Sequence, residues 1–205
     1  MSFNYYKISR YGSDEHKFMS KSTSIVDFVE IYGHIEISNY LKLENNFIKF
    51  LKMFYDFFTQ PFKSYGYTSL AFNIIISEDL DSNKDSLLYY GMTDTAKRLN
   101  KLSKLNLNSI AENDVSFLFK CWVRGLCSLY FFDIVTSSSL KPMEDDFYFS
   151  LILQEDIELN EIFSDVDGVH VYVDFDHYTS NESYIPPINI GEKIKINSPK
   201  DGTRL

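Results

Sequence analysis

The sequence predicts an α+β fold in a single domain, with a mixed or antiparallel sheet packed on a long apolar central helix and on further helices. Three observations predict it. The chain of 205 residues is 44 % apolar and 17 % aromatic, which is enough to bury a sizeable core. The aromatic run from Leu43 to Thr59 has helical spacing, and the run from Val169 to Phe175 alternates as a strand does. The run from Val115 to Tyr130 is apolar on nearly all faces of a helix, so other elements must surround it. The domain is expected to span residues 1–205, with a candidate subdomain boundary near 136–142 and a mobile tail at 197–205.

The first part of the chain is expected to form a strand, a helix and a second strand. Phe3 to Ile8 has the pattern of a short opening strand, whereas Ser24 to Ile37 fits a helix at its start and a strand at its end. Apolar side chains from Leu43 to Thr59 recur every three or four residues, which predicts a helix that Pro61 ends. The β-branched and aromatic run from Thr68 to Ile76 predicts a buried strand.

Two further helices are expected in the middle of the chain. Asp94 to Leu105 has a basic polar face, which we expect to be solvated because the protein as a whole is acidic. Val115 to Tyr130 is apolar nearly all round and predicts the central helix. Lys120 and Arg124 near the middle of that segment would be costly in hydrocarbon, so we do not expect it to span a membrane.

The cysteines and the amino terminus favour a cytoplasmic protein. Cys121 and Cys127 would face different ways on one helix, so we interpret them as reduced core thiols without a disulfide or a zinc site. Met1 to Arg10 lacks the charged start, the apolar stretch and the cleavage site of a secretory signal. We therefore expect a cytoplasmic location.

Negative charge is concentrated in one stretch, residues 142–191. This stretch contains twelve carboxylates and no Lys or Arg, and the formal net charge of the whole chain is −9. A field of one sign repels polyanions and attracts basic partners. A surface that serves only solubility usually mixes positive and negative side chains, and this stretch does not. The pattern therefore favours a basic protein as partner and disfavours nucleic acid. The simpler alternative, that the acids only keep a Phe-rich protein soluble, stays open.

Two strands flank a short acidic helix within this stretch. Phe147 to Leu153 predicts a strand, and Asp156 to Phe163 predicts the helix. Val169 to Phe175 alternates strictly between apolar and polar residues, so we expect its polar face to lie in water. The candidate partner-binding residues are that polar face, its flanking turns and the acids before the first strand: Asp165, Asp167, His170, Tyr172, Asp174, Asp176, His177, Tyr178, Glu144, Asp145 and Asp146.

The same cluster of Asp and His raises the alternative of a metal-dependent enzyme. Hard cations bind several carboxylate oxygens, but the run from Asp165 to Gly168 lacks the further ligands of a calcium loop, and no zinc-ligand spacing occurs in the sequence. Motifs for a serine or cysteine nucleophile and for a phosphate-binding loop are also missing. We therefore expect no catalytic residues, no metal and no cofactor, and keep as the alternative an enzyme that uses the cluster at 165–177.

In overall character the chain is small, acidic, rich in tyrosine and without catalytic motifs. In this it resembles the bacterial immunity proteins of contact-dependent growth inhibition and other polymorphic toxin systems. The resemblance implies a tight complex with a cognate basic toxin domain, such as a nuclease, whose active site the protein would occlude. It implies no particular fold and no residue roles. A nucleic-acid mimic that inhibits a DNA-binding protein would share the same electrostatics and differ only in its partner.

Overall fold

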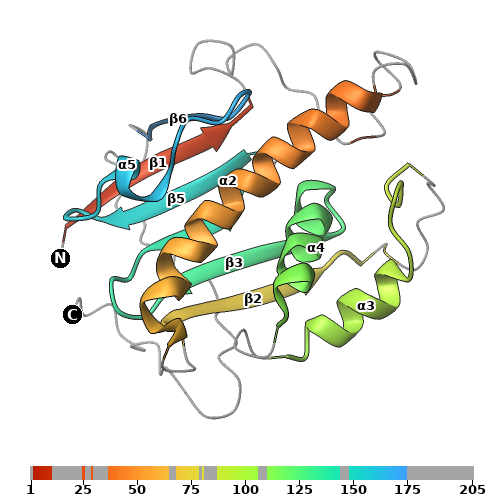
Figure 1. Ribbon diagram of the computed structural model, residues 1–205, viewed down its shortest axis with the longest axis horizontal. Coiled ribbons are helices and arrows are strands. Elements are labelled where there is room, and N and C mark those ends of the chain that lie inside the picture. The colour runs from red at the N-terminus through yellow and green to blue at the C-terminus, as the bar shows by residue number, and fades with distance from the viewer. Residues whose placement is uncertain are drawn as a thin grey trace.

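An antiparallel sheet of six strands, covered on one face by helices, forms the body of the protein (Figure 1). The computed structural model describes residues 2–10, 25, 29, 37–64, 68–78, 80, 87–105, 110–143 and 148–174. The strands are β1 (Phe3–Ser9), β2 (Leu70–Ile76), β3 (Cys127–Asp133), β4 (Ser139–Pro142), β5 (Tyr148–Gln154) and β6 (His170–Val173). The helices are α2 (Ile37–Lys63), α3 (Thr95–Leu102), α4 (Glu112–Val123) and α5 (Leu159–Ile162). This confirms the predicted α+β class.

The first strand lies inside the sheet, beside two strands from the other end of the described chain. The strand order is β2-β3-β4-β5-β1-β6, and each neighbouring pair is antiparallel. In β6, His170 lies opposite Ser9 of β1, and Val173 lies opposite Tyr6. The acidic stretch therefore supplies β5 and β6 on the two sides of β1, and β6 is one of the two edge strands of the sheet as described, β2 being the other. Residues 136–142, the candidate subdomain boundary, include β4, which pairs with both β3 and β5.

Helix α2 packs its aromatic stripe on the sheet. Phe47, Phe54 and Phe58 are buried, with the Phe47 ring 5.9 Å from that of Phe149 and the Phe54 ring 6.2 Å from that of Phe131. The helical periodicity at Leu43 to Thr59 therefore predicted the core face correctly. Pro61 lies inside α2 and does not end it. A proline so close to the end of a helix removes one hydrogen bond, and only two residues follow it.

The expected helix from Val115 to Tyr130 is wrong in its second half. Helix α4 ends at Val123, and the chain returns as strand β3 from Cys127. Gly125 has φ +69° and donates its N–H to the carbonyl of Trp122 at 3.0 Å, while the N–H of Leu126 donates to the carbonyl of Cys121 at 2.9 Å. These two bonds form a Schellman motif, which ends a helix at a residue that adopts positive φ. The long central helix is therefore α2.

Both cysteines are buried and free, as predicted, although they lie on α4 and β3 and not on one helix. Burial is the main cause that raises the pKa of the Cys121 thiol to about 12 and that of Cys127 well above its usual value. The thiolate is the reactive form of cysteine, so both thiols are unreactive packing groups.

The remaining predicted elements are close to those of the structure. Strands β1, β2 and β5 match the predicted strands within two residues, and α5 occupies the middle of the expected acidic helix. On α3, Arg98 is not simply solvated, because its Nε donates to Asp114 at 2.9 Å and its guanidinium lies 3.9 Å from the centre of the Phe117 ring. Most of Ser24 to Ile37, Phe175 and the tail 197–205 lie outside the described residues.

Candidate functional site

Residues 155–167, which make up most of the connection from β5 to β6, are an acidic segment that holds most of the described carboxylates of the acidic stretch. Its apolar side chains fix it to the body of the protein: Ile157 and Ile162 are buried, and the ring of Phe163 stacks on that of Phe50 at 3.9 Å with 3° between the planes. All of its carboxylates are exposed; they are Glu155, Asp156, Glu158, Glu161, Asp165 and Asp167.

Few cations compensate this segment within the described part of the chain. Lys42 on α2 forms an ion pair with Asp167 at 3.0 Å, and the amide of Asn46 donates to the carbonyl of Asp167 at 2.8 Å. The side chains of Lys42 and Asp167 are 70 % and 79 % exposed, so this pair contributes little to stability. The other five carboxylates form no ion pair with a described residue. The segment therefore carries negative charge that faces solvent.

The residues predicted to form the polar face of β6 are not all exposed to solvent as expected. His170 is exposed, but Asp174 is only 3 % exposed and pairs with Lys7 of β1 at 2.9 Å. Val173, expected on the buried face, is 40 % exposed. The expectation that Asp174 lies in water is wrong, because the register places Lys7 opposite Tyr172, on the face that Asp174 shares. Alternation identified the strand but did not show which of its faces is covered.

The ionisable groups on that face, which are partly or fully buried, perturb one another. Burial is the main cause that raises the pKa of Tyr172 and of Tyr148, and the positive charge of Lys7 partly opposes the shift of Tyr148. Burial also lowers the pKa of Lys141, which the charge of Asp174 partly offsets. These shifts follow from packing between β4, β5, β1 and β6, so we interpret Asp174 and its neighbours as structural.

The described residues do not form a metal site that would support the alternative of a metal-dependent enzyme. They contain no group of three or more His, Cys, Asp and Glu side chains that could hold a metal ion. Asp167 and Asp174 pair with different lysines, on α2 and β1. Asp165 is exposed. The other candidates lie outside the described residues: Asp176, His177, Tyr178, Glu144, Asp145 and Asp146.

A buried ion pair between α2 and α4 was missed in the sequence. Glu44, expected on a polar face of its helix, is fully buried, and its carboxylate accepts hydrogen bonds from both Nε and Nη2 of Arg124, the latter at 3.0 Å. Nη1 of Arg124 donates to the carbonyls of Leu88 and Tyr90 at 3.1 and 2.6 Å. The arginine thus ties α4 to α2 and to the turn at 87–91. A charged residue inside an apolar run was the signal, because such a charge needs a buried partner.

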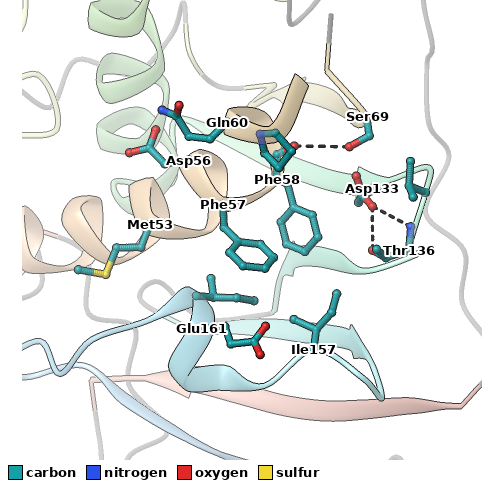
Figure 2. Close-up of a pocket in the computed structure, with 13 residues that line it drawn as sticks. Met53, Asp56, Phe57, Phe58, Gln60, Ser69, Asp133, Thr136, Ile157 and Glu161 are labelled. Carbon is teal, nitrogen blue, oxygen red and sulfur yellow. Dashed lines mark hydrogen bonds between the residues drawn. The ribbon is translucent and has the colours of Figure 1, made fainter. Parts of the chain in front are cut away.

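An open groove of about 910 Å³ lies beside the acidic segment, between the last turns of α2, the β3–β4 turn and α5 (Figure 2). In Figure 2 the rings of Phe57 and Phe58 point from α2 toward Ile157. The described lining is mainly apolar, and no Lys or Arg is among its described residues. Three carboxylates do: Asp56, Asp133 and Glu161.

Asp133 is the unusual member of this lining, because it is a carboxylate at the end of a core strand. It is 1 % exposed, and Oδ2 accepts from the N–H and the hydroxyl of Thr136, both at 2.8 Å. Oδ1 is buried without a hydrogen-bond donor. No described cation pairs with it. A buried charge of this kind is costly, and a cation brought near it would offset the cost.

Comparison with known proteins gives no match: no family model, no curated protein and no solved structure matches the chain. Among the described helices, none combines the length and the apolar content that crossing a bilayer requires. The functional interpretation therefore rests on the sequence and on the geometry above.

Proposed function

We propose that this protein binds a basic protein partner through the acidic segment 155–167 and occludes the partner's functional surface, as an immunity protein does with its toxin. The observation that carries the proposal is the exposure of six carboxylates on one short connection, of which only Asp167 pairs with a described cation. Such an arrangement is self-repelling in the free protein, and the repulsion is relieved when a cationic surface docks.

The segment is also held in place, which favours recognition over simple solubility. Ile157, Ile162 and Phe163 anchor it to α2, so little conformational freedom is lost when its carboxylates meet a partner. Exposed charges of one sign steer a basic protein toward this surface and raise the association rate. A polyanionic partner such as DNA would be repelled.

The test is to express the chain together with the product of the gene immediately upstream, which the proposal expects to be a basic toxin, and to assay that protein's toxic activity, such as nuclease activity, with and without the chain. We expect a one-to-one complex in which the activity is lost. We also expect the association rate to fall by at least about tenfold between low and physiological salt, because salt screens steering by exposed charges.

Three other results would contradict the proposal. A complex whose formation does not depend on salt would exclude the acidic segment as the steering surface. A partner that is a DNA-binding protein without toxic activity would favour a nucleic-acid mimic. A rise in melting temperature with magnesium, manganese or zinc in place of a protein partner would favour a metal-dependent enzyme.

A further inference from the structure

The groove next to the acidic segment has both an apolar floor and an acidic rim. We propose that it holds an amphipathic basic helix of the partner, with apolar side chains entering the groove and Lys or Arg side chains meeting its carboxylates. This inference rests on the proposed function and names the chemistry of the partner surface. The closest contact between the partner's helix and this protein would then lie at α2 and α5 and not at the edge strand β6.

The apolar floor is already open to solvent. Val135, in the β3–β4 turn, is 62 % exposed, and Phe57 on α2 is only partly buried. Ile157 and Ile162 form the opposite wall. An exposed apolar patch that is bordered by charged residues commonly marks a binding site.

The walls favour a helix over an added strand. Side chains of α2 and α5 form most of the groove, and β3, which ends beside it, already pairs with β2 and β4. The two described edge strands, β2 and β6, contribute no residue to the groove, although Ser69, one position before β2 begins, lines it. A helix that lays apolar anchors into a groove made of side chains is the recognition mode that fits such walls.

Charge complementarity identifies the helix as basic. Glu161 is exposed at the rim, Asp133 has a buried oxygen without a donor, and the lining residues that the structure describes include no Lys or Arg. A cationic side chain that enters near Val135 would approach Asp133 and offset its charge. An acidic or neutral helix would leave that charge uncompensated.

The groove is continuous with the proposed acidic surface. Ile157, Glu161 and Ile162 belong both to the groove and to the acidic segment. The exposed carboxylates would therefore steer the partner, and the groove would hold it once it arrives. In such interfaces a few buried anchors supply most of the affinity, whereas the charged rim sets the rate of encounter.

The experiment uses the full chain, labelled with ¹⁵N, and a synthetic peptide of about 18 residues built only from Leu and Lys at helical spacing. We expect the peptide to shift the amide signals of Met53, Val135 and Ile157. Val135→Lys should raise the Kd by at least about tenfold, since it removes an anchor and adds a repelling charge. Ile75→Lys is the matched control: Ile75 is 46 % exposed on β2, outside the groove, and its substitution should change the Kd by less than about twofold.

Three results would overturn the docking proposal. One is no binding of the peptide, or shifts confined to β6. Another is an equal loss of affinity in Val135→Lys and Ile75→Lys. The third concerns the chain's own basic end, which carries Lys193 and Lys195. If Lys193→Glu with Lys195→Glu in the full chain tightens peptide binding by about tenfold or more, the chain's own segment competes for the groove.

A further pair of variants, assayed with the upstream-encoded protein, separates failure of this inference from failure of the proposed function. Glu155→Gln with Asp156→Asn changes the acidic segment outside the groove. If this variant slows association while Val135→Lys leaves dissociation unchanged, the acidic surface stands and the groove is excluded. If neither variant has an effect, both proposals fail. If the first slows association and the second speeds dissociation by at least about tenfold, both are supported.

Discussion

Two groups of carboxylates in this protein differ in what surrounds them. Glu44 and Asp174 are buried, and each contacts a cation from a distant part of the chain: Arg124 for Glu44 and Lys7 for Asp174. The acids of segment 155–167 are exposed, and only Asp167 has a described cation. Buried and neutralised acids hold elements together, whereas exposed acids of one sign create a field beyond the surface. The two groups should therefore respond to substitution in opposite ways.

The largest expected effect on stability is that of Glu44→Gln. It leaves the guanidinium of Arg124 fully buried without its counter-ion, so we expect a loss of about 3–5 kcal/mol in the free energy of unfolding. The measurement is urea denaturation monitored by circular dichroism. Glu112→Gln is the control, because Glu112 pairs with Lys52 between the same two helices but is 68 % exposed. The control should cost less than about 1 kcal/mol. Equal losses would contradict a special role for the buried pair.

A smaller loss is expected for Asp174→Asn. The substitution keeps the shape of the side chain but removes the charge that faces Lys7, which is itself 15 % exposed. We expect a loss of about 1–3 kcal/mol in thermal or urea unfolding. Asp165→Asn, on the exposed segment, should change stability by less than about 0.5 kcal/mol. If Asp174→Asn behaves like Asp165→Asn, Asp174 belongs with the binding surface after all.

The thiols extend the comparison to groups that are buried and neutral. Burial raises the pKa of Cys121 to about 12, above its value in the unfolded chain. The folded protein then keeps a proton that the unfolded chain releases, so the contribution of this thiol to stability should fall as pH rises from about 9 toward 12 and should be constant below that range. At pH 8 we expect no reaction of either cysteine with Ellman's reagent until the protein is unfolded. Rapid reaction of the native protein would show that α4 opens.

The smallest effect on stability is expected for the exposed acids. Neutralising Glu155, Asp156, Glu158 and Glu161 together as Gln, Asn, Gln and Gln should leave the melting temperature unchanged or slightly raised, because the substitutions remove repulsion and no described ion pair. Differential scanning calorimetry at low salt is the measurement. A clear loss of stability would show that these carboxylates are structural partners.

Much of this fold follows from local pattern, and the failures have local causes. The spacing of the Phe residues between Leu43 and Thr59 predicts both the helix and its buried face, since that spacing depends only on helical geometry. The run from Val115 to Tyr130 misled because the apolar and aromatic residues that continue from α4 into β3 suit either a helix or a strand. Gly125 was the signal for a break, and its effect depends on adopting positive φ.

The candidate site was less predictable, because its charges are sorted by contacts between distant residues. Asp174 and Asp167 have similar sequence surroundings, yet one is buried against β1 and the other is exposed beside α2. Nothing local to Glu44 indicates that Arg124, eighty residues away, will cover it. The excess of acids over bases in residues 142–191 was visible directly, since it requires only counting. Which of them face solvent depends on strand register and helix packing.

The role of the acidic segment is tested most directly by stopped-flow association of the chain with the proposed basic partner, sought as the product of the gene immediately upstream, measured across a range of salt concentrations. The wild-type rate should fall steeply with salt. The variant with Glu155, Asp156, Glu158 and Glu161 neutralised should associate at least about tenfold more slowly at low salt and show a much flatter salt dependence. If the two proteins associate at the same rate and respond to salt in the same way, the acidic segment is not the surface that meets the partner.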